Sequence, residues 1–254
     1  MPARHRARLS MIAAVAVVAL AVPATTAGAV PAPHAAPPAP ELVQVGTYAY
    51  LTAPDYDPLA PISTVLQGPS TIGLGTFAGL DGEMVVVGGV PYRVGLDGVP
   101  RPVAPSTPTP FAEAVAFRPS TSLPVAPGTT CAAIDGLVAS AAGTAAEGVV
   151  AVRVRGTFTS LVTRSVPAQA TPYPPLADVV ATQTTFDLGT RRAVLVGFRT
   201  GPAAAGIGAP GLHLHGLTAD RAAGGHVLSC VAGSDVQLSI EPVASVRVVM
   251  PTAQ

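Results

Sequence analysis

The chain has 254 residues, a formal charge of zero at pH 7, 11% charged residues and 49% hydrophobic residues. All 14 basic residues are Arg, and neither Lys nor Trp occurs. A neutral chain with scattered Arg lacks the basic patch of a nucleic-acid-binding protein, so no nucleic-acid partner is expected. The absence of Lys excludes catalysis through a Schiff-base lysine and phosphate binding by a loop lysine.

The first 29 residues have the pattern of a secretory signal peptide. A basic segment at 4–8 precedes a 12-residue apolar run at 11–22, which is short for a membrane span of about 20 residues. Small residues at 27–29 predict cleavage before Val30, which makes the protein exported or secreted and free of the membrane after cleavage. The alternative is an uncleaved N-terminal anchor. Cleavage removes 29 of 254 residues and three of 14 Arg, leaving 225 residues and a formal charge of about −3.

Residues 30–40 are rich in Pro and Ala and predict an extended linker, which contains His34. The remaining residues, 41–254, predict one folded domain, with 41–170 and 171–254 as two possible sub-halves. We expect a sheet-dominated α+β fold, in which two mixed or antiparallel β-sheets share a core with a few short helices. The expected elements are a strand before a tight Asp81-Gly82 turn, two strands around a Gly-Gly turn in 83–94, a helix at 130–142 capped by Thr129 or Thr130, strands with one covered face in 149–166, a short helix at 175–182, a strand at 192–200, and one or two strands in 236–250.

Two cysteines, Cys131 and Cys230, occur in the chain. In an exported protein they can form one intramolecular disulfide. Two buried thiols are the alternative, because the sequence does not show whether the residues are close together.

Three of the five histidines, His213, His215 and His226, fall within fourteen residues. On a strand, residues i and i+2 project from the same face, so His213 and His215 could reach one ion. Asp220, Arg221 and a Gly-Gly pair could turn the chain and return His226 on a neighbouring strand as a third ligand. Three neutral His ligands leave coordination positions open, as catalytic zinc sites do. The alternative is surface or core histidines with unrelated roles.

Two other residues, Glu83 and Arg164, could have either a functional or a purely structural role. The glycines at 73–83 lack the spacing of a phosphate-binding loop, and they lead to Glu83, which could be functional or a solvated turn carboxylate. Arg164 sits in a strand-like run and could be functional or a solvent-facing strand arginine.

Five blocks of sequence, in order, resemble the bacterial alpha-acetolactate decarboxylase family, and the similarity extends over about residues 42–250. The G-T-F-x-x-L-D-G-E and G-x-H-L-H…R-x-x-G-G-H-V patterns are its most specific parts. The blocks are GLGTFAGLDGEMVVVGGVPYRV (73–94), VRVRGTFTSLVTRSV (152–166), YPPL (173–176), VLVGFRT (194–200) and GLHLHGLTADRAAGGHVLS (211–229).

The resemblance implies a metal-dependent carboxy-lyase that converts the small molecule 2-acetolactate to acetoin and CO2. It implies that His213, His215 and His226 bind Zn²⁺ or another divalent transition metal, which acts as the electron sink for an enediolate. Glu83 and Arg164 would be catalytic: Arg164 would hold the carboxylate, and Glu83, or else Arg164, would deliver the proton in a stereospecific step. Thr76 would line the substrate pocket.

The sequence departs from the family pattern in two places. Family members carry a second glutamate in a tail after the last strand, whereas residues 251–254 contain no carboxylate and Glu241 precedes the final strand. We expect either that water takes that place, that activity and stereocontrol differ, or that catalysis is lost. Residues 102–148 also diverge, and we expect them to shape either the entrance to the site or the contact of a homodimer.

Two other functions therefore remain as alternatives to decarboxylation of acetolactate. One is a secreted, catalytically weakened relative that acts as a binding module. The other is a metal-dependent lyase or hydrolase acting on a different small keto acid.

Overall fold

The computed structural model describes residues 39–250, which belong to one compact unit. The predicted signal peptide, residues 30–38 of the predicted linker and residues 251–254 lie outside this range. Among the described residues, no helix is both long and apolar enough to cross a membrane.

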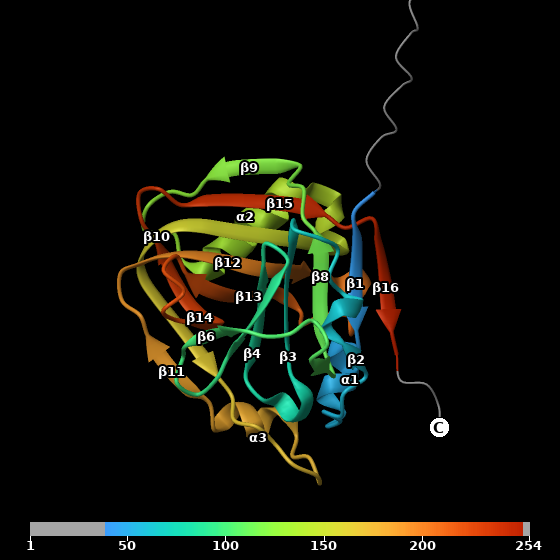
Figure 1. Ribbon diagram of the computed structural model, residues 1–254. Helices are drawn as coiled ribbons and strands as arrows, with labels where there is room; N and C mark the ends of the chain where they lie inside the picture. The colour runs from blue at the N-terminus through green and yellow to red at the C-terminus, as the bar shows by residue number, and fades with distance from the viewer. Residues whose placement is uncertain (1–38, 251–254) are drawn as a thin grey trace, which may run out of the picture. The chain divides into compact units, whose positions relative to one another are not determined.

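The first of two large β-sheets has seven strands (Figure 1). It contains the strand expected before Asp81 and the two strands expected in 83–94. Its pairs are antiparallel except for β1 with β16, which run parallel and bring the two ends of the described chain together. The order is β16 (Ser245–Val249), β1 (Glu41–Val45), β8 (Ala112–Ala116), β3 (Thr71–Thr76), β4 (Glu83–Val87), β5 (Val90–Val94) and β6 (Pro100–Pro102).

The second sheet also has seven strands, and all its pairs are antiparallel. The 17-residue strand β10 organises it, since it pairs with β12 and β11 on one side and with β15 and β14 on the other. The strands are β9 (Thr121–Pro124), β10 (Val149–Ser165), β11 (Thr184–Asp187), β12 (Arg191–Thr200), β13 (Gly211–Thr218), β14 (Gly224–Ala232) and β15 (Gln237–Pro242). A separate two-stranded sheet joins β2 (Ala60–Pro61) to β7 (Pro108–Thr109).

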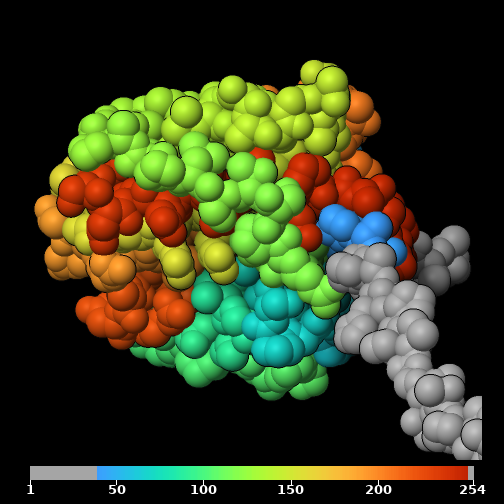
Figure 2. Space-filling model, turned by 90° about the horizontal axis from the view of Figure 1, so that it is seen from above, coloured from blue at the N-terminus to red at the C-terminus, as the bar shows by residue number. Residues whose placement is uncertain are grey.

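Helices are few and short, as expected for this fold class. They are α1 (Tyr48–Thr52), α2 (Cys131–Ala142), α3 (Leu176–Ala181) and the 3₁₀ turns Ile62–Thr64, Ala78–Leu80, Gly143–Glu147 and Pro202–Ala204. The predicted cap of α2 is confirmed, because the Thr130 hydroxyl accepts a hydrogen bond from the Ala133 amide at 3.2 Å. Figure 2 shows the segment of β9 and α2 (green to yellow-green) at the surface of this unit.

Two details of the expected elements differ from the structure. The connection from β3 to β4 is longer than a tight turn, because the 3₁₀ turn Ala78–Leu80 precedes Asp81 and Gly82. The first half of β10 is covered on both faces: Val149 and Ala151 pack in the core between the sheets, while Val150, Val152 and Val154 pack in a second core with α2. Both faces of an alternating strand can be buried when its small apolar residues meet different layers.

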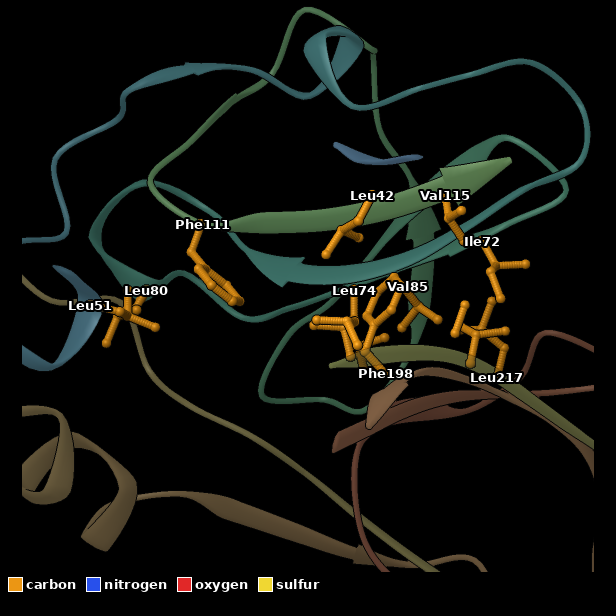
Figure 3. Packing of buried hydrophobic residues seen from close by; sticks show 14 of the residues in the cluster. Leu42, Leu51, Ile72, Leu74, Leu80, Val85, Phe111, Val115, Phe198 and Leu217 are labelled. Atoms are coloured by element: carbon orange, nitrogen blue, oxygen red, sulfur yellow. The ribbon is translucent and has the colours of Figure 1, made fainter. Parts of the chain in front are cut away.

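The main core lies between the two sheets. Figure 3 shows Leu42, Ile72, Leu74, Val85 and Val115 of the first sheet packed towards Phe198 and Leu217 of the second. Burying such side chains stabilises the fold by about 1.5–3 kcal/mol each. The core thereby holds the two sheets against each other.

Cys131 and Cys230 form the disulfide, with a Cα–Cα distance of 5.1 Å. It joins the first residue of α2 to β14 and closes a loop with a sequence separation of 99. Because such a cross-link restricts the unfolded chain, we expect Cys131→Ser with Cys230→Ser to lower the free energy of unfolding by about 2–4 kcal/mol. Urea denaturation measures this loss, and an unchanged midpoint in the double variant contradicts it.

Glu113 on β8 is a buried carboxyl whose two oxygens have no hydrogen-bond partner among the described residues. Burial raises its pKa to about 8. An unfolded Glu carboxyl has a pKa of about 4.3, so between that pH and about 8 the folded state holds a proton that the unfolded state has lost. The stability should therefore fall as the pH rises through this window.

Glu113→Gln should remove this dependence, because an amide does not ionise. We expect the variant to unfold at a higher urea concentration than the wild type at pH 8, by about 1–3 kcal/mol in free energy, and to differ less at pH 5. Urea denaturation at several pH values measures the difference. Parallel curves for the two proteins would show that Glu113 does not titrate as described.

Candidate metal centre

The three clustered histidines lie on one β-hairpin. His213 and His215 are on β13, two residues apart, and His226 on β14 lies directly opposite His215. The predicted return of the chain is confirmed, although the turn is made by residues 219–223, where the Asp220 carboxylate accepts hydrogen bonds from the Thr218 hydroxyl and the Ala222 amide. The expected Gly-Gly pair begins β14 instead of forming the turn.

The three imidazoles converge on one point. His226 Nδ1 lies 3.2 Å from His213 Nε2 and 3.2 Å from His215 Nε2. The candidate ligand atoms of the three residues all lie within 4.8 Å of one another. His215 Nδ1 donates a hydrogen bond to the Met84 carbonyl at 2.7 Å, which leaves the Nε2 lone pair free to face the other two rings.

The surroundings keep these rings neutral. Burial, followed by the positive charge of Arg164, lowers the pKa of His213 to about 4. Burial also holds the pKa values of His215 and His226 well below the usual range, with neighbouring histidines adding to the effect. Neutral imidazole is the form that binds metals, and three such donors fit a divalent transition metal that keeps open coordination positions.

Arg164 reaches the same site through strand register. On β10 it lies directly opposite His226 of β14, and His226 lies opposite His215 of β13, so the three residues form one row across three strands. Residues directly opposite each other project from the same face of a sheet. Gly225 allows β14 to come this close, because a Cβ at this residue would lie 2.4 Å from the Arg164 carbonyl oxygen.

Glu83 is brought from the other sheet, at the start of β4. Its Oε1 lies 3.7 Å from Arg164 Nε and its Oε2 lies 3.5 Å from His215 Nε2. The Glu83 and Arg164 side chains are only 7% and 13% exposed. Glu83 is therefore not a solvated turn carboxylate, and Arg164 is not a solvent-facing strand arginine. Burial raises the pKa of Glu83 to about 7, against the opposing effect of Arg164.

Thr76 at the end of β3 also lies at the site. It is buried and lines the same pocket, and its hydroxyl donates a hydrogen bond to the Gly82 carbonyl at 2.8 Å. That bond ties β3 to the turn that precedes Glu83. The structure therefore brings all six residues singled out in the sequence into one pocket.

This pocket has a volume of about 440 Å³. Its lining combines the six polar residues named above with apolar side chains, among them Leu51 of α1, Leu176 and Val180 of α3, and Val166. Sequence patterns did not identify these residues, because short helices with one apolar face are common in any core.

Glu241 takes no part in the pocket. It lies on β15, is buried, and accepts a hydrogen bond from the Arg118 amide at 2.7 Å. Residues 251–254 lie outside the described residues. Among residues 39–250, Glu83 is the one carboxyl that lines the pocket.

Comparisons with known proteins show which family the chain resembles. An alpha-acetolactate decarboxylase of Methanosarcina mazei is 37% identical over 188 residues, and one of Brevibacillus brevis is 32% identical over 257 aligned positions. The matches cover 74% and 96% of this chain, and 64% and 88% of the relatives' own lengths. The chain thus spans less than two thirds of the Methanosarcina protein.

A crystal structure of alpha-acetolactate decarboxylase from Bacillus subtilis has a similar fold, with a TM-score of 0.78 and 30% identity over 84% of this chain and 90% of that chain. The family model for alpha-acetolactate decarboxylase matches residues 42–254. Because that match includes most of the sequence, the chain belongs to the alpha-acetolactate decarboxylase family.

Proposed function

We propose that this protein is a metal-dependent carboxy-lyase that converts 2-acetolactate to acetoin and CO2. The observation that carries the proposal is the convergence of three neutral imidazoles in a pocket that also holds Arg164 and Glu83. Family membership supports the choice of substrate, since the relatives are named for this activity.

The reaction requires a sink for electrons. Acetolactate carries its carboxylate next to a ketone and a hydroxyl, and the loss of CO2 leaves an electron pair on the former carboxylate-bearing carbon. A Zn²⁺ or other divalent transition metal ion bound by His213, His215 and His226 would supply Lewis-acid stabilisation of that charge. A chain with no Lys cannot supply the alternative, an amine catalyst.

Arg164 is the residue that we assign to the substrate carboxylate. Its guanidinium lines the pocket beside the histidine cluster and is largely removed from solvent. A planar guanidinium can bind a carboxylate through two parallel hydrogen bonds, and low exposure strengthens that attraction. Arg164 thereby orients the group that leaves.

Glu83 is the residue that we assign to proton delivery. It is the buried carboxyl that faces both Arg164 and His215 from the opposite sheet. A carboxyl held on one side of the pocket delivers a proton to one face of the planar intermediate, which would give acetoin of one handedness.

His213→Ala should remove one of the three ligands. We expect metal content to fall from about one ion per chain to well below half, and acetoin formation to fall by roughly 100-fold or more. Elemental analysis of the purified protein and an acetoin assay measure the two effects. His34→Ala, in the predicted linker, is the matched control, and full activity in His213→Ala would argue against a catalytic metal here.

Glu83→Gln and Arg164→Ala should separate the two roles. We expect Arg164→Ala mainly to raise KM, because carboxylate binding is lost, and Glu83→Gln mainly to lower kcat by about 100-fold. Steady-state kinetics with acetolactate measure both, with the exposed residues Arg101→Ala and Glu147→Gln as controls. Near-normal turnover in both site variants would overturn these assignments.

The other proposals rest on the sequence alone. We propose export on the basis of residues 1–29, with an uncleaved anchor as the alternative, and a homodimer stays a prediction from the divergent segment 102–148.

A panel of small keto acids distinguishes acetolactate from the other substrates considered above, and absence of turnover on all of them favours a binding module.

A further inference from the structure

Gln183 is a polar residue outside the pocket lining that contacts the pocket arginine. Its Oε1 accepts a hydrogen bond from Arg164 Nη1 at 3.3 Å. The Arg164 Nε atom, by contrast, is buried and has no hydrogen-bond partner among residues 39–250, since Glu83 Oε1 lies 3.7 Å away. Among residues 39–250, Gln183 is therefore the residue whose side chain forms a hydrogen bond with the Arg164 guanidinium.

The backbone around Gln183 holds it in place from two directions. Its amide donates to the Val180 carbonyl at 3.1 Å, which continues the last turn of α3. Immediately after it, β11 pairs with β10 so that Thr184 faces Ser165 and Thr185 faces Arg164. The short segment that presents Leu176 and Val180 to the pocket thus also presents an acceptor to Arg164.

The chemistry of the acceptor matters because it carries no charge. An amide oxygen orients a guanidinium without neutralising it, whereas a carboxylate at the same distance would form an ion pair with it. The Glu83 carboxyl also faces Arg164, but its Oε1 lies 3.7 Å from Arg164 Nε, beyond hydrogen-bond distance. A pocket arginine whose hydrogen-bond acceptor is uncharged retains its attraction for a bound anion.

We propose that Gln183 is a positioning residue that orients the Arg164 guanidinium and, by being neutral, leaves its positive charge available to a substrate carboxylate. The inference rests on the proposed function for the identity of that carboxylate. It predicts that Gln183 acts on the affinity of the pocket for a bound carboxylate and not on the chemical step.

Two variants of nearly equal size test this role. Gln183→Met keeps the length of the side chain and loses the acceptor, and Gln183→Glu keeps an acceptor and adds a negative charge. Gln237→Glu, an exposed residue on β15, adds the same charge elsewhere. Thermal unfolding of each variant shows whether the fold is retained.

The first measurement is calorimetric binding of 2-hydroxy-2-methylpropanoate, an unreactive 2-hydroxy carboxylate, to the metal-loaded full-length protein. We expect Kd to rise about 10-fold or more in Gln183→Glu, about 3-fold in Gln183→Met, and less than 2-fold in Gln237→Glu. A Gln183→Glu variant that binds the anion as well as the wild type overturns the proposal. Equal weakening in both Gln183 variants overturns it too, because charge would then not be the deciding property.

The second measurement is the kinetics of acetolactate decarboxylation. We expect KM to rise in Gln183→Glu while kcat stays within about 3-fold, whereas a general structural defect would lower kcat and the unfolding temperature together. If the wild type does not turn over acetolactate but the binding difference persists, the proposed function fails and the role of Gln183 stands. If the wild type is active and neither KM nor Kd changes, the role of Gln183 fails alone.

Discussion

The register between β10 and β14 is the constraint on which the site depends. The two strands pair in one register near Phe158, shift by one residue before Ser160, and shift back between Val162 and Thr163. Without the second shift, Arg164 would face Val227 instead of His226, because a slip of one residue exchanges the two faces of a strand. These β-bulges therefore decide whether the arginine and the histidines point into the same pocket.

The packing of the two sheets brings the residues of the first sheet to the site. The turn between β3 and β4 places Glu83 and the Met84 carbonyl against His215, so the first sheet provides both an acid and the acceptor that sets the proton position on the ring. The apolar core between the sheets stabilises this contact, since separating the sheets would expose Leu74, Val85, Phe198 and Leu217 together.

Burial gives the site its electrostatic character. The pKa values of the histidines fall and that of Glu83 rises for the same reason, namely that a charge in this pocket is poorly solvated. Gln183 contacts the Arg164 guanidinium with a neutral group. Among the described residues, the pocket lining combines this guanidinium with three neutral imidazoles and apolar side chains, which suits a small anion with alkyl substituents.

The sequence by itself indicated the fold class, the main strands, the capped helix and the grouping of the histidines, because alternation, capping and the i, i+2 spacing are local properties of the chain. The turn after His215 is local too, since Asp220 forms it with its own neighbours. The resemblance to the family also indicated site roles for Glu83, Arg164 and Thr76. Without it, Glu83 and Arg164 could equally have been solvent-exposed residues with a structural role. Only the tertiary structure decided that Cys131 meets Cys230, that β-bulges align Arg164 with His226, that Gln183 contacts Arg164, and that apolar side chains of α1 and α3 line the pocket. Those contacts join residues far apart in the chain, and they depend on strand register and sheet packing, which no local pattern encodes.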